Sequence, residues 1–199
     1  MSVWMVVGLG NPGPTYSLTR HNVGYMVADE LAGRARAGWA APRGMRAEVV
    51  ETRIGPAGIG VPSTEADRVV LVKPRTFMNN SGQAVGKLAA FHRVAADHVV
   101  VVHDELDLDL GQLRLKFGGG DNGHNGLKSL RQHLGTGDFY RVRFGIGRPT
   151  GRQDAADYVL AQIPPALRTD VELETSRAAD AVETLIVSGL EAAQNRFNG

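Results

Sequence analysis

The chain has 199 residues, of which 43% are hydrophobic and 22% are charged. This composition is typical of a globular protein with one sizeable core, and we expect a single domain over residues 1–199. Cysteine is absent, which excludes disulfides, a thiol nucleophile and a cysteine-ligated metal. Because there is neither a bilayer-length apolar run nor a secretory signal pattern, we expect a cytoplasmic protein without a membrane partner.

The charge is distributed unevenly along the chain, although the formal net charge is only +1. Residues 110–152 carry eight Lys and Arg against two Asp and Glu, whereas residues 153–199 carry three against eight. A basic middle in a near-neutral protein indicates an anionic partner that meets one face, but a solvated basic surface gives the same pattern.

The first predicted strand, at residues 3–7, runs into the glycine-rich segment GLGNPG at residues 8–13. The three glycines match the Gly-x-Gly-x-x-Gly pattern of dinucleotide-binding folds, in which a helix opens inside the glycine run. Here Pro12 and Pro14 remove backbone donors and disfavour helical angles nearby. The segment therefore predicts a rigid loop that holds polar side chains at a strand end, with a dinucleotide-dependent oxidoreductase as an alternative.

Strands and helices alternate along the remaining chain, which predicts an α/β fold. We expect a single domain with a twisted, mostly parallel (mixed) central sheet flanked by helices, with one or two antiparallel strands added. Asn22 is positioned to cap the first helix, which should run to about residue 37. Further strands are expected at 48–54, 68–73, 99–102, 112–117 and 140–145, and further helices around 85–92, 127–134, 154–161 and from 165 onward.

The β-branched run at residues 99–102 predicts a central strand that is buried on both faces. Ligands of such sheets bind beyond the carboxyl ends of the strands. Asn11, Asn79 and Asp104 each follow or end a predicted strand, so they should meet at one edge. Each also has a structural explanation, since Asn is common in turns and Asp104 can accept backbone hydrogen bonds. Their convergence favours a site.

The motif inventory narrows the chemistry of this site. The sequence has no Gly-x-Ser-x-Gly elbow, no His-Glu-x-x-His and no P-loop. The His and acidic residues at 103–109 suggest a metal, but alternate residues of a strand point to opposite faces, and their spacing matches no known ligand loop. Without a metal, a histidine, a buried Asp and several neutral amides remain. These groups suit hydrolysis by activated water without a covalent intermediate.

Four segments carry motifs in a fixed order. They are GLGNPG at 8–13 with Tyr16 and RHNVG at 20–24, KPRTFMNNSG at 73–82, HDELD at 103–107, and GGGDNGHNGL at 118–127. Together they resemble the bacterial peptidyl-tRNA hydrolase family over most of the chain. The resemblance implies a monomeric, cofactor-free α/β enzyme that cleaves the ester between a peptide and the 3′ ribose of tRNA, with no DNA partner.

The resemblance also implies roles for individual residues of the catalytic centre. His21 would be the base that activates water, and Asp104 would hold the imidazole in the correct tautomer. Asn11 and Asn79 would position the water and the scissile carbonyl group. Asn125 would help to hold the peptide and the 3′-terminal end of the tRNA.

The remaining implied roles concern substrate binding. The residues Gly123 and His124 would contact the peptide and the 3′ end, the side chains of Tyr16, Phe77 and Met78 would line the cleft, and Lys116 and Arg143 would grip a tRNA phosphate. The sequence departs from the family pattern at Asn122, where a glycine is usual, although Asn tolerates positive φ angles. Two further alternatives are a catalytically inactive RNA-binding module on the same fold and a metallohydrolase.

Overall fold

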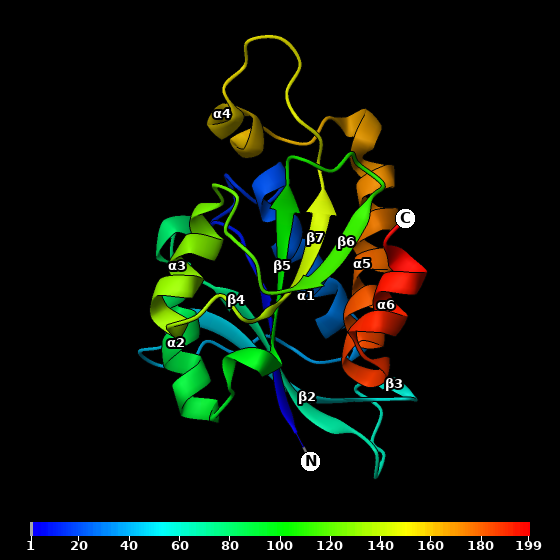
Figure 1. Cartoon of the computed structure of the whole chain (residues 1–199). Coiled ribbons are helices and arrows are strands. Elements are labelled where there is room, and N and C mark those ends of the chain that lie inside the picture. Colours follow the sequence, from blue (N-terminus) through cyan, green and yellow to red (C-terminus); the bar gives the residue numbers. More distant parts are fainter. Residues whose placement is uncertain (1) are drawn as a thin grey trace.

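A seven-stranded sheet forms the centre of the molecule, with strand order β3-β2-β4-β1-β5-β7-β6. The computed structural model describes residues 2–199, and Figure 1 shows its arrangement. The strands are β1 (Val3–Gly8), β2 (Ala47–Gly55), β3 (Gly58–Ile59), β4 (Asp67–Pro74), β5 (Val99–Glu105), β6 (Leu113–Phe117) and β7 (Tyr140–Gly145).

The directions of the strands confirm the predicted mixed sheet. The four central strands β4, β1, β5 and β7 are parallel. Strand β2 is antiparallel to β4, and β6 is antiparallel to β7. All carboxyl ends of the four parallel strands therefore lie at one edge of the sheet, where the sequence places its polar side chains.

Helices cover both faces of the sheet (Figure 1). One face carries α1 (Val23–Arg34), α5 (Arg168–Ser188) and α6 (Leu190–Phe197), the other carries α2 (Ser81–His92) and α3 (Asn125–Leu134), and the short α4 (Ala155–Leu160) lies beyond the sheet edge. Strand β5 contributes Val100 and Val102 to one hydrophobic core, and Val99 and Val101 to the other. The predicted central strand, buried on both faces, is confirmed.

The chain differs from the sequence prediction at its C-terminal end. One long helix was expected from residue 165 onward. The structure instead has two helices, α5 and α6, because Gly189 adopts a φ of 91° between them. A residue without a Cβ takes this conformation easily, and the chain can then fold Ala193 and Phe197 back into the core.

Helix α1 packs very closely against the ends of β1 and β5. A Cβ atom at Gly24 would lie 2.4 Å from the carbonyl oxygen of Val102, and one at Gly8 would lie 2.2 Å from the carbonyl oxygen of Gly24. Only glycine permits this approach. The short 3₁₀ turn η1 (Arg20–Asn22) immediately before α1 is thereby held at the carboxyl edge of the sheet. Within residues 2–199, no helix is long and apolar enough to cross a membrane.

Candidate active site

A cleft of about 450 Å³ lies at the carboxyl ends of the central strands. The expected convergence of Asn11, Asn79 and Asp104 is confirmed, because all three line this cleft. The other predicted residues in its wall are Tyr16, His21, Phe77, Met78, Gly123, His124 and Asn125. Lys116 and Arg143 lie outside it, on β6 and β7.

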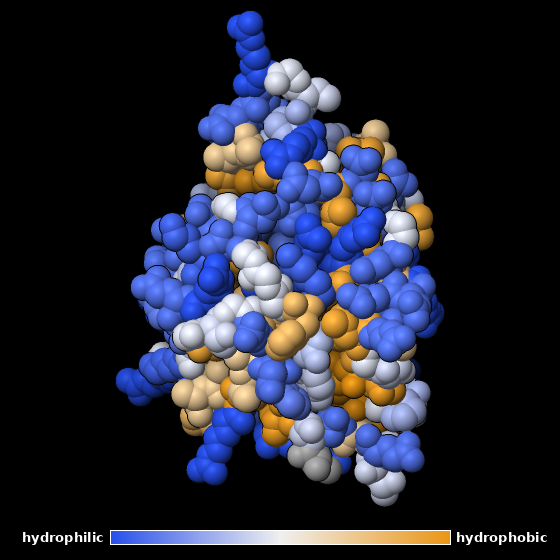
Figure 2. All heavy atoms as spheres, viewed as in Figure 1, coloured by the Kyte–Doolittle hydropathy of each residue, from blue (hydrophilic) through white to orange (hydrophobic). Residues whose placement is uncertain are grey.

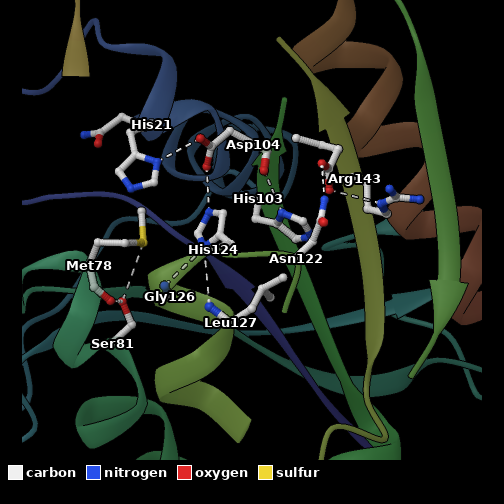
Figure 3. Close-up of polar contacts among 12 residues, drawn as sticks. His21, Met78, Ser81, His103, Asp104, Asn122, His124, Gly126, Leu127 and Arg143 are labelled. Atoms are coloured by element: carbon white, nitrogen blue, oxygen red, sulfur yellow. Dashed lines mark hydrogen bonds and ion pairs between the residues drawn. The ribbon is translucent and has the colours of Figure 1, made fainter. Parts of the chain in front are cut away.

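His21 and Asp104 form a partly buried hydrogen-bonded pair in the cleft (Figure 3). The distance from His21 Nδ1 to Asp104 Oδ2 is 2.8 Å, and only 3% of the Asp104 side chain is exposed. An ionised carboxylate can only accept, so Nδ1 of His21 carries the proton that it donates. The other ring nitrogen, Nε2, therefore has a lone pair whenever the imidazole is neutral.

His124 forms a hydrogen bond with the second oxygen of the Asp104 carboxylate. Its Nε2 lies 2.8 Å from Asp104 Oδ1, while its Nδ1 accepts from the backbone N–H groups of Gly126 and Leu127 at the start of α3. A nitrogen that accepts cannot carry a proton, so His124 is neutral and protonated at Nε2. His124 thus caps α3 and also fixes the second oxygen of Asp104, with its ring centroid 5.1 Å from that of His21 (Figure 3).

His21, Asp104 and His124 form a hydrogen-bonded triad, and the contacts within it explain the pKa shifts of His21 and Asp104. Burial disfavours the imidazolium of His21, but the adjacent Asp104 charge and its hydrogen bond outweigh burial and raise the pKa of His21. Burial alone would raise the pKa of Asp104, whereas the contacts with His21 and His124 hold it well below its usual range. Asp104 is therefore ionised throughout the physiological pH range.

Asn11 is held by Asn22, a residue that the sequence had suggested as a helix cap. The Asn22 amide accepts from Asn11 N at 2.8 Å and donates to Asn11 O at 2.9 Å, and its side chain does not cap α1. The capping prediction is wrong because the buried backbone of Asn11 needs these two partners more than an accessible helix end does. The sequence offers no local signal for a bond between residues so far apart.

The orientation of the Asn11 amide follows from its contact with the backbone of Met78. Asn11 Oδ1 accepts from Met78 N at 2.7 Å, which identifies the other terminal atom as Nδ2. Asn11 lines the cleft, and within residues 2–199 its Nδ2 has no hydrogen-bond acceptor. The site therefore presents one neutral, fixed hydrogen-bond donor beside His21.

His21, Asp104 and His124 also place potential metal-ligand atoms within 4.8 Å of one another. The hydrogen bonds described above use the inner nitrogen of each imidazole to donate to Asp104. His124 would have to lose its Nε2 proton, and Asp104 both of its donors, before the group could bind a cation. The contacts fit a hydrogen-bonded triad better than a metal centre. The neighbouring His103 packs edge to face against His124, with ring centroids 5.1 Å apart, and its Nδ1 donates to the backbone oxygen of Asp104 at 2.8 Å. Burial lowers the pKa of His103 to about 3.

The outer wall of the cleft is mainly apolar. Tyr16 and Phe77 meet edge to face with their ring centroids 6.3 Å apart, and Phe77 is 56% exposed. On the other side, α4 contributes Val159 and Leu160, which the sequence analysis did not assign to the site. Figure 2 shows the corresponding hydrophobic patch around α4, above a mostly hydrophilic face. His21, Asp104 and His124 are thus flanked by apolar side chains on both sides of the cleft.

A basic region lies beside the cleft, where the glycine-rich loop 118–124 passes over β6 and β7. Arg143 donates from Nε to Glu105 Oε2 at 3.3 Å. Burial and then the nearby charge of Arg143 lower the pKa of Lys116, which places these two cations close together. Cations gathered in this way favour an anionic ligand.

Arg141 is a residue of this region that sequence reasoning missed. It is fully buried and donates to the carbonyl oxygens of Gly119, Gly120 and Gly137. The guanidinium therefore supports the glycine-rich loop from beneath. Arg141 and Arg143 lie two residues apart on β7 and therefore on the same face of the sheet, so strand alternation gave no signal that Arg141 is buried while Arg143 is partly exposed.

Comparisons with known proteins identify the family of the chain. The family model described as peptidyl-tRNA hydrolase matches residues 5–199. The chain is 59% identical to the peptidyl-tRNA hydrolase of Cutibacterium acnes, with 98% of each chain covered. It is 54% identical to that of Streptomyces coelicolor, with 98% of this chain and 94% of the relative covered.

A solved structure extends the agreement from sequence to fold. The crystal structure of peptidyl-tRNA hydrolase from Acinetobacter baumannii matches with a TM-score of 0.86 and 31% sequence identity, and the match covers 99% of this chain and 95% of that one. The comparisons of sequence and of fold therefore give the same family. On this evidence the chain belongs to the peptidyl-tRNA hydrolase family.

Proposed function

We propose that this protein hydrolyses the ester between a peptide and the 3′ ribose of tRNA, with water activated by His21. The observation that carries the proposal is the pair of fixed tautomers around Asp104. Because both imidazoles donate to this carboxylate, His21 Nε2 is left as the basic nitrogen in the cleft. Family membership supports the choice of substrate.

In the first step, His21 Nε2 removes a proton from a water molecule while the water oxygen bonds to the ester carbonyl carbon. The negative charge that develops on the carbonyl oxygen is stabilised by neutral amide donors, for which Asn11 Nδ2 is the best-oriented candidate. We assign Asn79 and Asn125 to the positioning of the water and the substrate. The imidazolium formed is stabilised by Asp104.

In the second step, the bond from the carbonyl carbon to the ribose 3′ oxygen breaks. The carbonyl re-forms and the proton on His21 Nε2 passes to that oxygen, so His21 is neutral again and free tRNA leaves with the peptide as a carboxylic acid. The acid then loses its proton to solvent and becomes a carboxylate. An alcohol leaves more easily than an amine, so one base with neutral donors suffices. No covalent enzyme intermediate is required.

Substrate selection divides between the two sides of the cleft in this proposal. The peptide contacts Tyr16, Phe77 and Met78 on the apolar wall, with Gly123 and His124 beside its backbone. A tRNA phosphate lies against Lys116 and Arg143, outside the cleft. Phosphate contacts position a nucleic acid without reading its sequence, which suits an enzyme that accepts many tRNAs.

Hydrolysis of an N-acetylated aminoacyl-tRNA by the purified protein in excess EDTA tests this function. In ¹⁸O-labelled water, the label is expected in the released carboxylate and not in the ribose, because water attacks the carbonyl carbon. Cleavage that stops with the chelator would indicate a metallohydrolase. Binding of the tRNA without any cleavage would instead identify an inactive RNA-binding module.

A further inference from the structure

Asn122 makes contacts that the usual glycine could not make. Its backbone is left-handed, with a φ of 49°. Its amide Nδ2 donates to Glu105 Oε1 at 3.0 Å and to Asp107 Oδ2 at 2.7 Å. Glu105 is the last residue of β5, directly after Asp104, and Asp107 lies two residues beyond the strand. The side chain therefore ties the glycine-rich loop to the strand that carries the triad (Figure 3).

Glu105 links the Asn122 side chain to Arg143 in the basic region. Its other oxygen, Oε2, accepts from Arg143 Nε at 3.3 Å, and the Glu105 side chain is 6% exposed. A carboxylate bonded at both oxygens has a defined orientation. Within residues 2–199, neither terminal nitrogen of Arg143 has a hydrogen-bond partner, and its side chain is 20% exposed. Glu105 thus holds Arg143 by the inner nitrogen alone.

We propose that Asn122 is a positioning residue for tRNA binding, which orients Glu105 so that Glu105 presents the terminal nitrogens of Arg143 to a phosphate. This inference rests on the proposed function, since it assigns a phosphate to Arg143. The amide donor is well suited to the role because it bonds to two carboxylates at once without neutralising the charge that holds Arg143.

The alternative, a purely local role in stabilising the loop, predicts different behaviour. The loop is already supported by Arg141 beneath Gly119 and Gly120, and by His124 at the start of α3. Loss of Asn122 should therefore leave the loop in place and loosen Glu105, whose Oε1 would keep only the backbone N–H of Asp107, at 3.2 Å, as a donor. A local role would lower stability or turnover without a specific effect on the contact between Arg143 and the tRNA.

Two substitutions separate these possibilities. Asn122→Gly keeps the left-handed backbone and removes both hydrogen bonds. Asn122→Asp keeps the size and tolerates the same φ, but it places a carboxylate against Glu105 and Asp107. Thr64→Asp adds the same charge as a control, since Thr64 is exposed in the β3–β4 loop at the opposite edge of the sheet.

The measurement is the Kd for deacylated tRNA as a function of salt, made in parallel with kcat and KM for N-acetylated aminoacyl-tRNA. Asn122→Asp should raise Kd and KM by about tenfold and flatten the log–log salt slope by about 0.7 to 0.9, the value of one lost phosphate contact. Asn122→Gly should give a smaller effect in the same direction. Thr64→Asp should match the wild type.

Two combined variants make the test specific for Arg143. In an Arg143→Ala background, Asn122→Asp should cause no further rise in Kd, because the residue acts through Arg143. In Asn122→Asp combined with Glu105→Gln, the new amide can donate to the new carboxylate and still accept from Arg143, so affinity should recover. Additive effects of Asn122→Asp and Arg143→Ala would overturn the proposal, as would an unchanged Kd in both single variants.

The Kd measurements distinguish a failure of the positioning role of Asn122 from a failure of the proposed hydrolase function. If the wild type binds tRNA without cleaving the ester, the hydrolase assignment fails, while the Kd series still decides the role of Asn122. If the wild type cleaves the ester but the Kd series is flat, the hydrolase assignment stands and the positioning role is overturned.

Discussion

The two sides of the site are built in different ways. On the side of β1 and β5, His21, Asp104 and His124 are mostly buried, and each inner polar atom has a fixed partner. On the side of β6 and β7, the cations Lys116 and Arg143 are only partly buried, and Arg143 is held by a single ion pair with Glu105. Bond cleavage requires fixed tautomers and little water, whereas phosphate binding tolerates exposure and depends on net charge.

Replacing Asp104 should have the largest effect, and it should lower kcat on the catalytic side without weakening tRNA binding on the basic side. An amide in Asp104→Asn can accept on one terminal atom only, so it cannot receive a proton from both His21 and His124. One imidazole must then change its tautomer or lose its bond. We expect kcat to fall by about 10² to 10⁴, with KM for tRNA substrates changed far less. A larger effect on KM than on kcat would contradict the assigned role.

The pH dependence of kcat tests the role of Asp104 on the catalytic side. Asp104 raises the pKa of His21, and the base must be neutral, so kcat should rise with pH and level off above that pKa. Below it, kcat should fall by about tenfold per pH unit. Residual activity in Asp104→Asn should show an inflection at lower pH, because the stabilising charge is gone. The same inflection in both proteins would place the titrating group elsewhere.

The basic side should respond mainly in substrate affinity. Arg143→Ala and Lys116→Ala should each raise KM for N-acetylated aminoacyl-tRNA by about tenfold and flatten its log–log salt dependence by about 0.7 to 0.9. A short esterified analogue without the tRNA body should be affected much less. Arg53→Ala is the matched control, since Arg53 is exposed on β2 towards the opposite edge of the sheet. An unchanged slope would place the tRNA on another face.

The smallest expected effect concerns the support of the catalytic side. Gly24→Ala should lower the free energy of unfolding by about 1 to 3 kcal/mol, because its methyl group would collide with backbone atoms of Val102 and Leu9. Gly33→Ala, in the same helix but with open space around it, should be stabilising by up to about 1 kcal/mol. If urea unfolding gave equal changes in the free energy of unfolding for the two variants, close packing at Gly24 would be contradicted.

Much of this arrangement could be predicted from the sequence because it depends on local patterns. The β-branched run at 99–102 was sufficient to predict the central strand, and polar residues at strand ends were sufficient to predict the edge that carries the cleft. The break at Gly189 was missed because the apolar spacing continues through it. A positive φ cannot be read from spacing alone.

The partners of buried polar groups could not be predicted in this way. Asn22 has the sequence position of a helix cap, yet it bonds to the backbone of Asn11. Arg141 looks like one more member of a basic segment, yet it is fully buried under the glycine-rich loop. In both cases the bond joins residues that only the folded chain brings together. The tautomer of His124 likewise follows from its backbone partners at the start of α3.

The most direct test of the account compares wild type and His21→Ala in single-turnover cleavage of N-acetylated aminoacyl-tRNA, with excess EDTA. His98→Ala serves as a control, since His98 lies at the opposite end of β5. We expect His21→Ala to cleave about 10² to 10⁴ times more slowly while its fold and tRNA affinity are retained. Near-normal cleavage by His21→Ala would contradict the central claim that His21 is the base.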